Sequence, residues 1–187
     1  LKEGHHRFVH NQKDSRNLLQ QVNDTREGQW PFAVILSCID SRTSAELIFD
    51  QGLGDVFSIR IAGNIVNTDI MGHSKCGAVK GACDHVEMGN LTELLAKIQP
   101  AVYQETQTDD KELRNSANDV FVENVASLNV KRSVRAIVER SFILEQMIEK
   151  GEIGIIGAKH DLETGAVEFY EDSMLCNLAG VQANLGN

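Results

Sequence analysis

Three residues with metal-binding side chains stand in two short motifs. Cys38 follows a run of apolar residues, and His73 and Cys76 form a His-x-x-Cys motif directly after a glycine. Two thiolates and one imidazole without a fourth protein ligand are typical of a catalytic zinc site, in which water or substrate takes the open position. The alternative is structural, with Cys38 as a small buried side chain and His73 as a loop residue, because such short motifs also recur by chance.

An acid and a base lie close to the first of these residues, since Asp40 and Arg42 follow Cys38 almost directly. On an ordinary protein surface they would form an ion pair worth at most about 1 kcal/mol. Beside a metal, Arg42 can keep Asp40 ionised, and Asp40 can then accept the proton of a zinc-bound hydroxide and orient its lone pair. The sequence therefore predicts that Asp40 and Arg42 are catalytic.

The surrounding residues predict an α/β fold with a central, mostly parallel β-sheet flanked by helices. Residues 32–36 form a continuous apolar run, typical of a strand buried on both faces, which delivers Cys38 at its C-terminal end. Thr43 and Glu46 form a capping box that predicts a helix start. The other predicted elements are strands over 56–62, 153–159 and 166–170, and helices over 1–10, 15–22, 77–86, 91–103 and 118–150, the last with a break near Asn129 or Ser141.

The stretch between the second predicted strand and the His-x-x-Cys motif is too short for this fold. A crossover between parallel strands takes at least about 10 to 12 residues, and fewer separate Ile65 from His73. We therefore expect that a segment is absent between Ile70 and Met71. If the natural protein has further residues at this point, the enzyme is intact. A true deletion would instead remove the strand that positions His73 and Cys76, which predicts an inactive protein.

Size, charge and cysteine content exclude several classes of protein. The chain has 187 residues and 20.7 kDa, which predicts a single domain over residues 1–187. Its net charge of −9 repels phosphate backbones, and no run approaches the ~20 apolar residues of a membrane helix, so we expect neither a nucleic-acid nor a membrane partner. Four cysteines are too few for a disulfide scaffold and indicate the cytoplasm or another reducing compartment. The chain begins at Leu1, which leaves open a cleaved targeting segment upstream.

Three motifs in order give the chain a specific resemblance. Cys38-x-Asp40-x-Arg42, then Arg60-Ile61-Ala62-Gly63-Asn64, then Gly72-His73-Ser74-Lys75-Cys76-Gly77 resemble a β-class carbonic anhydrase, from Phe8 to the strand at Ile153. Gln29 and Phe57 match the plant-type branch of the family, whereas the other branch has tryptophan where this chain has Ile35. The family's helix and strand before the Gly-His motif, with a tyrosine of the plant-type pocket, are absent.

The resemblance implies a function and a role for each residue. Zn²⁺ held by Cys38, His73 and Cys76 would carry the hydroxide that converts carbon dioxide to bicarbonate and a proton, reversibly, with Asp40 and Arg42 as the catalytic dyad. The substrate-binding residues would be Gln29, donating to a substrate oxygen, and Phe57 and Ala62, with Phe57 in an apolar pocket across a dimer interface. The resemblance also implies a homodimer or homotetramer, with the N-terminal helices packing on a neighbouring subunit.

Two alternatives share the ligand set. Proteins of this fold also hydrolyse carbon disulfide or carbonyl sulfide, with specificity set by access to the site. A non-catalytic zinc module is the other, in which Asp40 closes the tetrahedron as a permanent fourth ligand.

Overall fold

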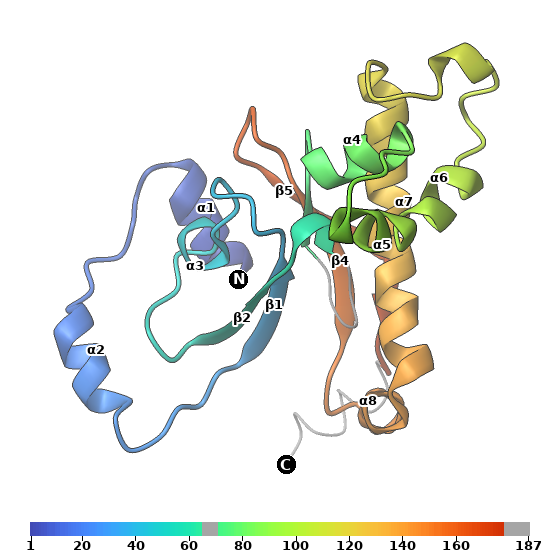
Figure 1. Cartoon of the computed structure of the whole chain (residues 1–187). Coiled ribbons are helices and arrows are strands. Elements are labelled where there is room, and N and C mark those ends of the chain that lie inside the picture. The colour runs from blue at the N-terminus through green and yellow to red at the C-terminus, as the bar shows by residue number, and fades with distance from the viewer. Residues whose placement is uncertain (65–70, 178–187) are drawn as a thin grey trace.

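A five-stranded sheet forms the centre of the molecule (Figure 1). The computed structural model describes residues 1–64 and 71–177. The strand order is β2-β1-β3-β4-β5, in which the first four strands run parallel and β5 is antiparallel to β4. The strands are β1 (Ala33–Ser37), β2 (Val56–Arg60), β3 (Met71–His73), β4 (Ile155–His160) and β5 (Val167–Leu175). The predicted α/β fold with a mostly parallel sheet is confirmed.

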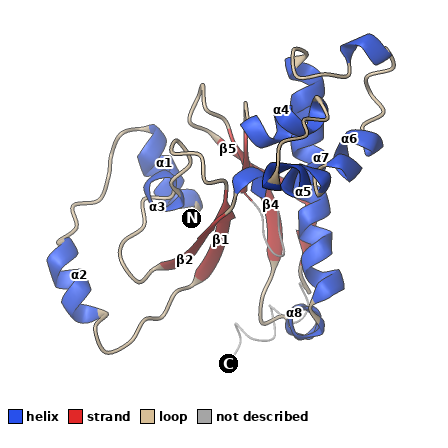
Figure 2. Cartoon of the chain, in the orientation of Figure 1, coloured by secondary structure: helices blue, strands red, loops and turns tan. Residues whose placement is uncertain are grey.

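Helices lie on both faces of the sheet, with α1 and α3 on one face and α4 to α7 on the other (Figures 1 and 2). They are α1 (Lys2–Val9), α2 (Leu18–Asp24), α3 (Ala45–Ile48), α4 (Gly77–Cys83), α5 (Asn90–Ala96), α6 (Gln99–Gln104), α7 (Asp119–Arg140) and α8 (Phe142–Glu149), with the short 3-10 helices η1 (Ala62–Asn64) and η2 (Lys111–Leu113).

The long helix α7 forms the largest part of the core. The Asn118 side chain caps its start by accepting a hydrogen bond from the Phe121 N–H, and Ser141 separates it from α8 and caps α8 in turn. One face of α7 buries apolar side chains such as Phe121 and Val125 against α4 and α6, and Val134 lies buried toward β4 and β5. The predicted break at Ser141 is therefore confirmed.

In the described residues, β1 is joined to β3 at one point. β1 pairs with β2 along its full length, and its described pairing with β3 is Ser37 opposite Met71. β3 in turn pairs with the second half of β4, beginning at Ala158. Ile70, on one side of the junction where the sequence predicts an absent segment, lies outside the described residues.

The N-terminal helix α1 packs on its own chain. Leu1 and Phe8 pack against a core cluster that includes Phe49, and the His5 ring accepts a hydrogen bond from the Val167 N–H at 3.0 Å. Leu1 and Phe8 are thus used within the chain, and packing of α1 on a neighbouring subunit stays a prediction. For α2, which buries none of its residues, packing on a neighbour stays a prediction.

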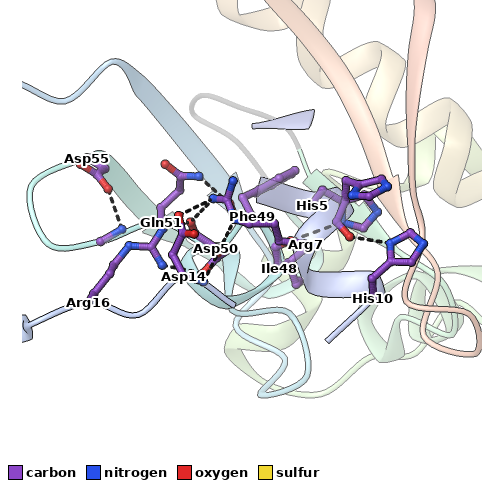
Figure 3. Close-up of polar contacts among 12 residues, drawn as sticks. His5, Arg7, His10, Asp14, Arg16, Ile48, Phe49, Asp50, Gln51 and Asp55 are labelled. Carbon is purple, nitrogen blue, oxygen red and sulfur yellow. Dashed lines mark hydrogen bonds and ion pairs between the residues drawn. The ribbon is translucent and has the colours of Figure 1, made fainter. Parts of the chain in front are cut away.

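A buried carboxylate ties the N-terminal arm to the end of α3 (Figure 3). Asp50 accepts hydrogen bonds from Arg7 at 2.5 Å, from Arg16 at 2.6 Å and from the Asp14 N–H at 3.2 Å. Burial by itself would raise the pKa of Asp50, but these donors together hold the pKa well below its usual range. Two arginines thus fix residues 7–16 to the domain.

Replacing this carboxylate should cost stability. We expect Asp50→Asn to lower the free energy of unfolding by about 1–3 kcal/mol at pH 7, because both arginines lose a charged partner. A depressed native pKa stabilises the fold above the unfolded value of about 3.9, and this contribution disappears as pH falls through the native pKa. Denaturant unfolding should therefore show a constant gap between variant and parent from pH 5 to 7 and a shrinking gap below about pH 4. Exposed Asp109→Asn is the matched control, and an equal effect there would contradict the assignment.

Candidate metal centre

The three predicted metal ligands meet at the carboxyl ends of two neighbouring strands. Cys38 follows the last residue of β1, His73 ends β3, and Cys76 is the residue from which α4 starts. The C-terminal ends of parallel strands lie at one edge of a sheet, so the single pairing of Ser37 with Met71 brings these residues together. All three are buried, and their ligand atoms lie within 4.8 Å of one another. The expectation of one cluster is thus confirmed in geometry.

The histidine is oriented as a metal ligand requires. Its Nδ1 lies 2.9 Å from the Ser74 carbonyl oxygen, to which a protonated Nδ1 donates. Its Nε2 is buried and has no hydrogen-bond partner among the described residues. With Nδ1 protonated, Nε2 carries a lone pair, and this lone pair faces the two thiols. Zinc-ligating imidazoles are commonly fixed in this way, with the other ring nitrogen donating to a carbonyl outside the metal site. A tetrahedral zinc separates such ligand atoms by about 3.5 to 4 Å, so the residues fit zinc.

The two thiols differ in acidity before any metal binds. The Cys76 thiol hydrogen bonds to Cys38 and lowers the pKa of Cys38, to which the Gly63 N–H, 3.4 Å from Sγ, also contributes. The same pairing, together with burial, raises the pKa of Cys76. The cluster therefore holds one thiolate readily, and the second requires a cation such as zinc to neutralise it.

Asp40 and Arg42 form a bidentate ion pair beside the cluster. Arg42 donates to both oxygens of Asp40, at 2.9 and 2.6 Å, and its own N–H adds a third bond at 3.0 Å. The side-chain bonds from Arg42 are the main reason that the pKa of Asp40 lies well below its usual range. The Asp40 Oδ2 also lies 4.0 Å from His73 Nε2. An ionised carboxylate, acting only as an acceptor, thus stands next to the open side of the ligand cluster.

Two side chains hold the loop that carries these residues by hydrogen bonding to its backbone carbonyls. The Arg60 side chain donates to the carbonyl oxygens of Cys38 at 3.1 Å and Asp40 at 2.6 Å. The Thr43 hydroxyl contacts the same two oxygens, at 3.1 and 2.9 Å. The capping box predicted for Thr43 is therefore wrong: α3 starts after Ser44, and the Thr43 hydroxyl is used by the loop instead. The sequence motifs contain Arg60, but only the fold reveals this role.

Asn129 is a supporting residue that the sequence reasoning did not single out. From the middle of α7 its amide donates to the Gly63 carbonyl at 3.2 Å, and the Gly63 N–H in turn contacts Cys38 Sγ. Gly63 has φ of 68°, a conformation that favours glycine. A polar residue at a core-facing position of an apolar helix was the available signal, since buried amides need partners.

The loop after β3 is anchored by the neighbouring strand. The Ser74 N–H donates to the carbonyl of His160 at 2.9 Å, and the Ser74 hydroxyl accepts from the Leu162 N–H at 2.9 Å. His160 pairs with His73 in the sheet register and is buried, and burial is the main reason that its pKa is lowered. The ligand loop is thus fixed from the β4 side.

Two of the three predicted substrate-binding residues lie away from this cluster. Gln29 is exposed in the loop before β1, and Ala62 lies in η1, next to Gly63. Phe57 lies on β2 opposite Val34, three residues before Ser37, so it is about 10 Å along the sheet from the end that carries Cys38. Phe57 is also 45% exposed. Within one chain, Gln29 and Phe57 are remote from the metal ligands.

Comparison with known proteins places these features in one family. The family model described as "Carbonic anhydrase" matches residues 33–70 and 67–167. The protein "Carbonic anhydrase 2" of Mycobacterium tuberculosis is 30% identical over 190 residues, covering 88% of this chain and 87% of that protein. A carbonic anhydrase of Mycolicibacterium smegmatis is 28% identical, covering 90% of this chain and 89% of that protein.

Solved structures show the same fold. A β-carbonic anhydrase of Aspergillus fumigatus superimposes with a TM-score of 0.71 at 24% identity, covering 90% of this chain and 88% of that one. The Coccomyxa enzyme, solved with acetazolamide, gives 0.69 at 20% identity, with the same coverage. The ligand cluster, the sheet order and these matches agree: the chain belongs to the β-class carbonic anhydrases.

Proposed function

We propose that this protein catalyses the reversible hydration of carbon dioxide to bicarbonate and a proton. The observation that carries the proposal is the meeting of Cys38, His73 and Cys76 within 4.8 Å, beside a carboxylate that Arg42 keeps ionised. When bound, zinc would act as a Lewis acid that lowers the pKa of a coordinated water toward about 7. The two thiolates and one imidazole are the residues that would hold it.

Asp40 and Arg42 divide the remaining work. Asp40 is ionised, so it can only accept a hydrogen bond, and Oδ2 is the oxygen that faces His73. It would hold the proton of the attacking oxygen and so orient that oxygen's free lone pair toward the carbon of the substrate. Arg42 keeps Asp40 charged and fixes its plane by two parallel bonds, a geometry that lysine could not reproduce.

The substrate pocket is proposed to be completed by a second copy of the chain. Phe57 and Gln29 lie at the opposite end of the strands from the metal ligands of their own chain, and the surface around them is apolar. Its exposed large side chains are Trp30, Phe32, Val34, Phe57 and Ile59. An apolar surface of this kind is typical of a subunit interface. Two β-carbonic anhydrases of Sordaria macrospora are described as tetrameric, which favours an assembly of this kind.

Gln29 and Phe57 also support assignment to the plant-type branch. In that assignment Gln29 donates to a substrate oxygen, and Phe57 and Ala62 line the apolar side of the pocket. Ile35 occupies the position at which the other branch has tryptophan, and it is buried.

Metal and activity should disappear together. We expect the zinc-loaded protein to hydrate CO₂ rapidly at alkaline pH and Cys38→Ser to lose most bound zinc and the rate with it, because the site then has one thiolate. Stopped-flow hydration and metal analysis measure both. Cys176→Ser, outside the cluster, should keep both. Bound zinc without hydration would contradict the proposal and favour a sulfur-substrate hydrolase or a site closed by Asp40.

Asp40 should matter for the rate but not for the metal. We expect Asp40→Asn to lower kcat/KM for hydration by about 10² or more while zinc content stays near one per chain, because the amide keeps the shape and loses the charge. Arg42→Lys should give a smaller loss. Asp109→Asn serves as the control, and an unchanged rate in Asp40→Asn would remove Asp40 from the reaction.

Subunit association should be needed for activity. We expect Phe32→Glu, in the exposed apolar surface, to shift the protein toward monomers in sedimentation and to lower the hydration rate, because a charge cannot be buried there without a partner. Phe142→Glu on α8, equally exposed, is the control. An active monomer would show that one chain holds a complete pocket.

A further inference from the structure

A strained backbone turn separates His73 from Cys76 in the ligand cluster. Lys75, the second of the two residues between them, has φ of 56°, in the left-handed region that residues other than glycine rarely adopt. The sheet fixes His73 on one side of this turn, and α4 starts from Cys76 on the other. The conformation of Lys75 therefore sets the distance between two metal ligands, and a conformation that lysine disfavours needs a contact that holds it.

A carboxylate of α7 provides this contact. Glu123 Oε1 accepts a hydrogen bond from the Lys75 N–H at 3.2 Å, although the two residues are 48 positions apart in the sequence. Within residues 1–64 and 71–177 no other acceptor binds this N–H. Because the donor is a backbone group, the bond acts on the conformation of the turn itself, whichever side chain stands at the position.

The sheet holds the other oxygen of the same carboxylate. Glu123 Oε2 accepts from Lys159 Nζ at 3.1 Å, and the Lys159 side chain is largely buried, with 18% of its surface exposed. Lys159 pairs with Gly72 in the register of β4 and β3, next to the pair that contains His73. Solvent screens such a partly buried ion pair less than a surface one. Glu123 thus bonds to the ligand turn and to the strand beside it at the same time.

A second acidic partner of Lys75 makes a different kind of contact. The Lys75 ammonium pairs with Glu163 in the turn between β4 and β5, where both side chains are exposed. Exposed ion pairs contribute little to the stability of a conformation. Glu163 binds the side chain of Lys75, whereas Glu123 binds its backbone. Two glutamates on one residue therefore allow the backbone contact to be tested against the side-chain contact.

We propose that Glu123 is a positioning residue of the metal centre. By holding the left-handed turn at Lys75, it keeps His73 and Cys76 at the separation that one zinc ion requires. Outer residues that orient metal ligands commonly change metal affinity by about 10- to 100-fold when they are replaced. The inference rests on the proposed function, because it concerns the same zinc site, but its test measures retention of the metal.

Zinc release tests this role. We expect Glu123→Ala to release zinc to excess chelator about tenfold faster than the parent or more, because the turn loses the acceptor of its N–H. Alanine favours a helix, so α7 should stay intact. A release rate equal to that of the parent would overturn the proposal.

A conservative variant separates the hydrogen bond from the charge. A glutamine side chain has one acceptor oxygen, which Lys159 would occupy, so Glu123→Gln is combined with Lys159→Met. The amide oxygen is then free to accept from the Lys75 N–H, and zinc release should stay within about threefold of the parent rate. Release as fast as in Glu123→Ala would overturn the proposal, because the charge and not the hydrogen bond would then hold the metal.

Two other glutamates are matched controls. Glu163→Ala removes the side-chain partner of Lys75, and Glu139→Ala removes an exposed glutamate of the same helix as Glu123. Both should release zinc within about twofold of the parent rate. An acceleration in either control that equals the effect of Glu123→Ala would overturn the proposal.

A glycine in the turn gives an independent arm. Glycine adopts the left-handed conformation readily, so adding Lys75→Gly to Glu123→Ala should restore most of the slow zinc release. The ligand-field absorption of the cobalt-substituted proteins reports the ligand geometry, and it should change in Glu123→Ala and return with Lys75→Gly. No recovery in either measurement would overturn the proposal.

CO₂ hydration is measured on the same samples. Zinc release that follows the expected pattern without hydration would overturn the proposed function and leave the role of Glu123 standing. Hydration with equal zinc release in all variants would overturn the role of Glu123 and leave the proposed function standing.

Discussion

Among the residues that the structure describes, one register pair, Ser37 opposite Met71, joins β1 to β3, and the metal centre depends on it. Cys38 follows one of these residues, and His73 and Cys76 follow the other. The contacts around the pair are correspondingly dense, because Arg60 and Thr43 fix the loop after β1 and the Ser74 N–H fixes the loop after β3. A site built from two loops needs such bonds, since a small displacement of either would separate the ligands.

The sequence predicted the parts of this structure whose signals are local. The apolar run before Cys38 and the break at Ser141 follow from periodicity and capping, and the structure has both. The ligand cluster was predicted from residue type, with a structural alternative left open, and became specific through the three ordered motifs that resemble the family. The chemistry of the centre was therefore accessible before its geometry.

Local sequence signals could not predict hydrogen-bond partners that lie far apart in the sequence. Thr43 matched a capping box, but in the structure its hydroxyl hydrogen bonds to two carbonyl oxygens of the Cys38 loop and does not cap the helix. Asn129 acts on the Cys38 loop across 66 residues through Gly63, which no window of sequence contains. The N-terminal arm is likewise held from a distance, because the buried carboxylate of Asp50 binds Arg7 and Arg16, more than 30 residues earlier in the chain.

The order in which the chain folds follows from the sheet topology. β1 and β2 are close in sequence, whereas Ser74 and Leu162, which join the two strand ends at the metal centre, are 88 residues apart. Closing such a long loop costs more chain entropy, so we expect this contact to form after the pairing of β1 with β2. We therefore expect Cys38 to lie in a part of the sheet that forms before the loop carrying His73 and Cys76 is fixed. Capture of the metal is then expected to be a late event in folding, so that a bound ion reports a completed domain.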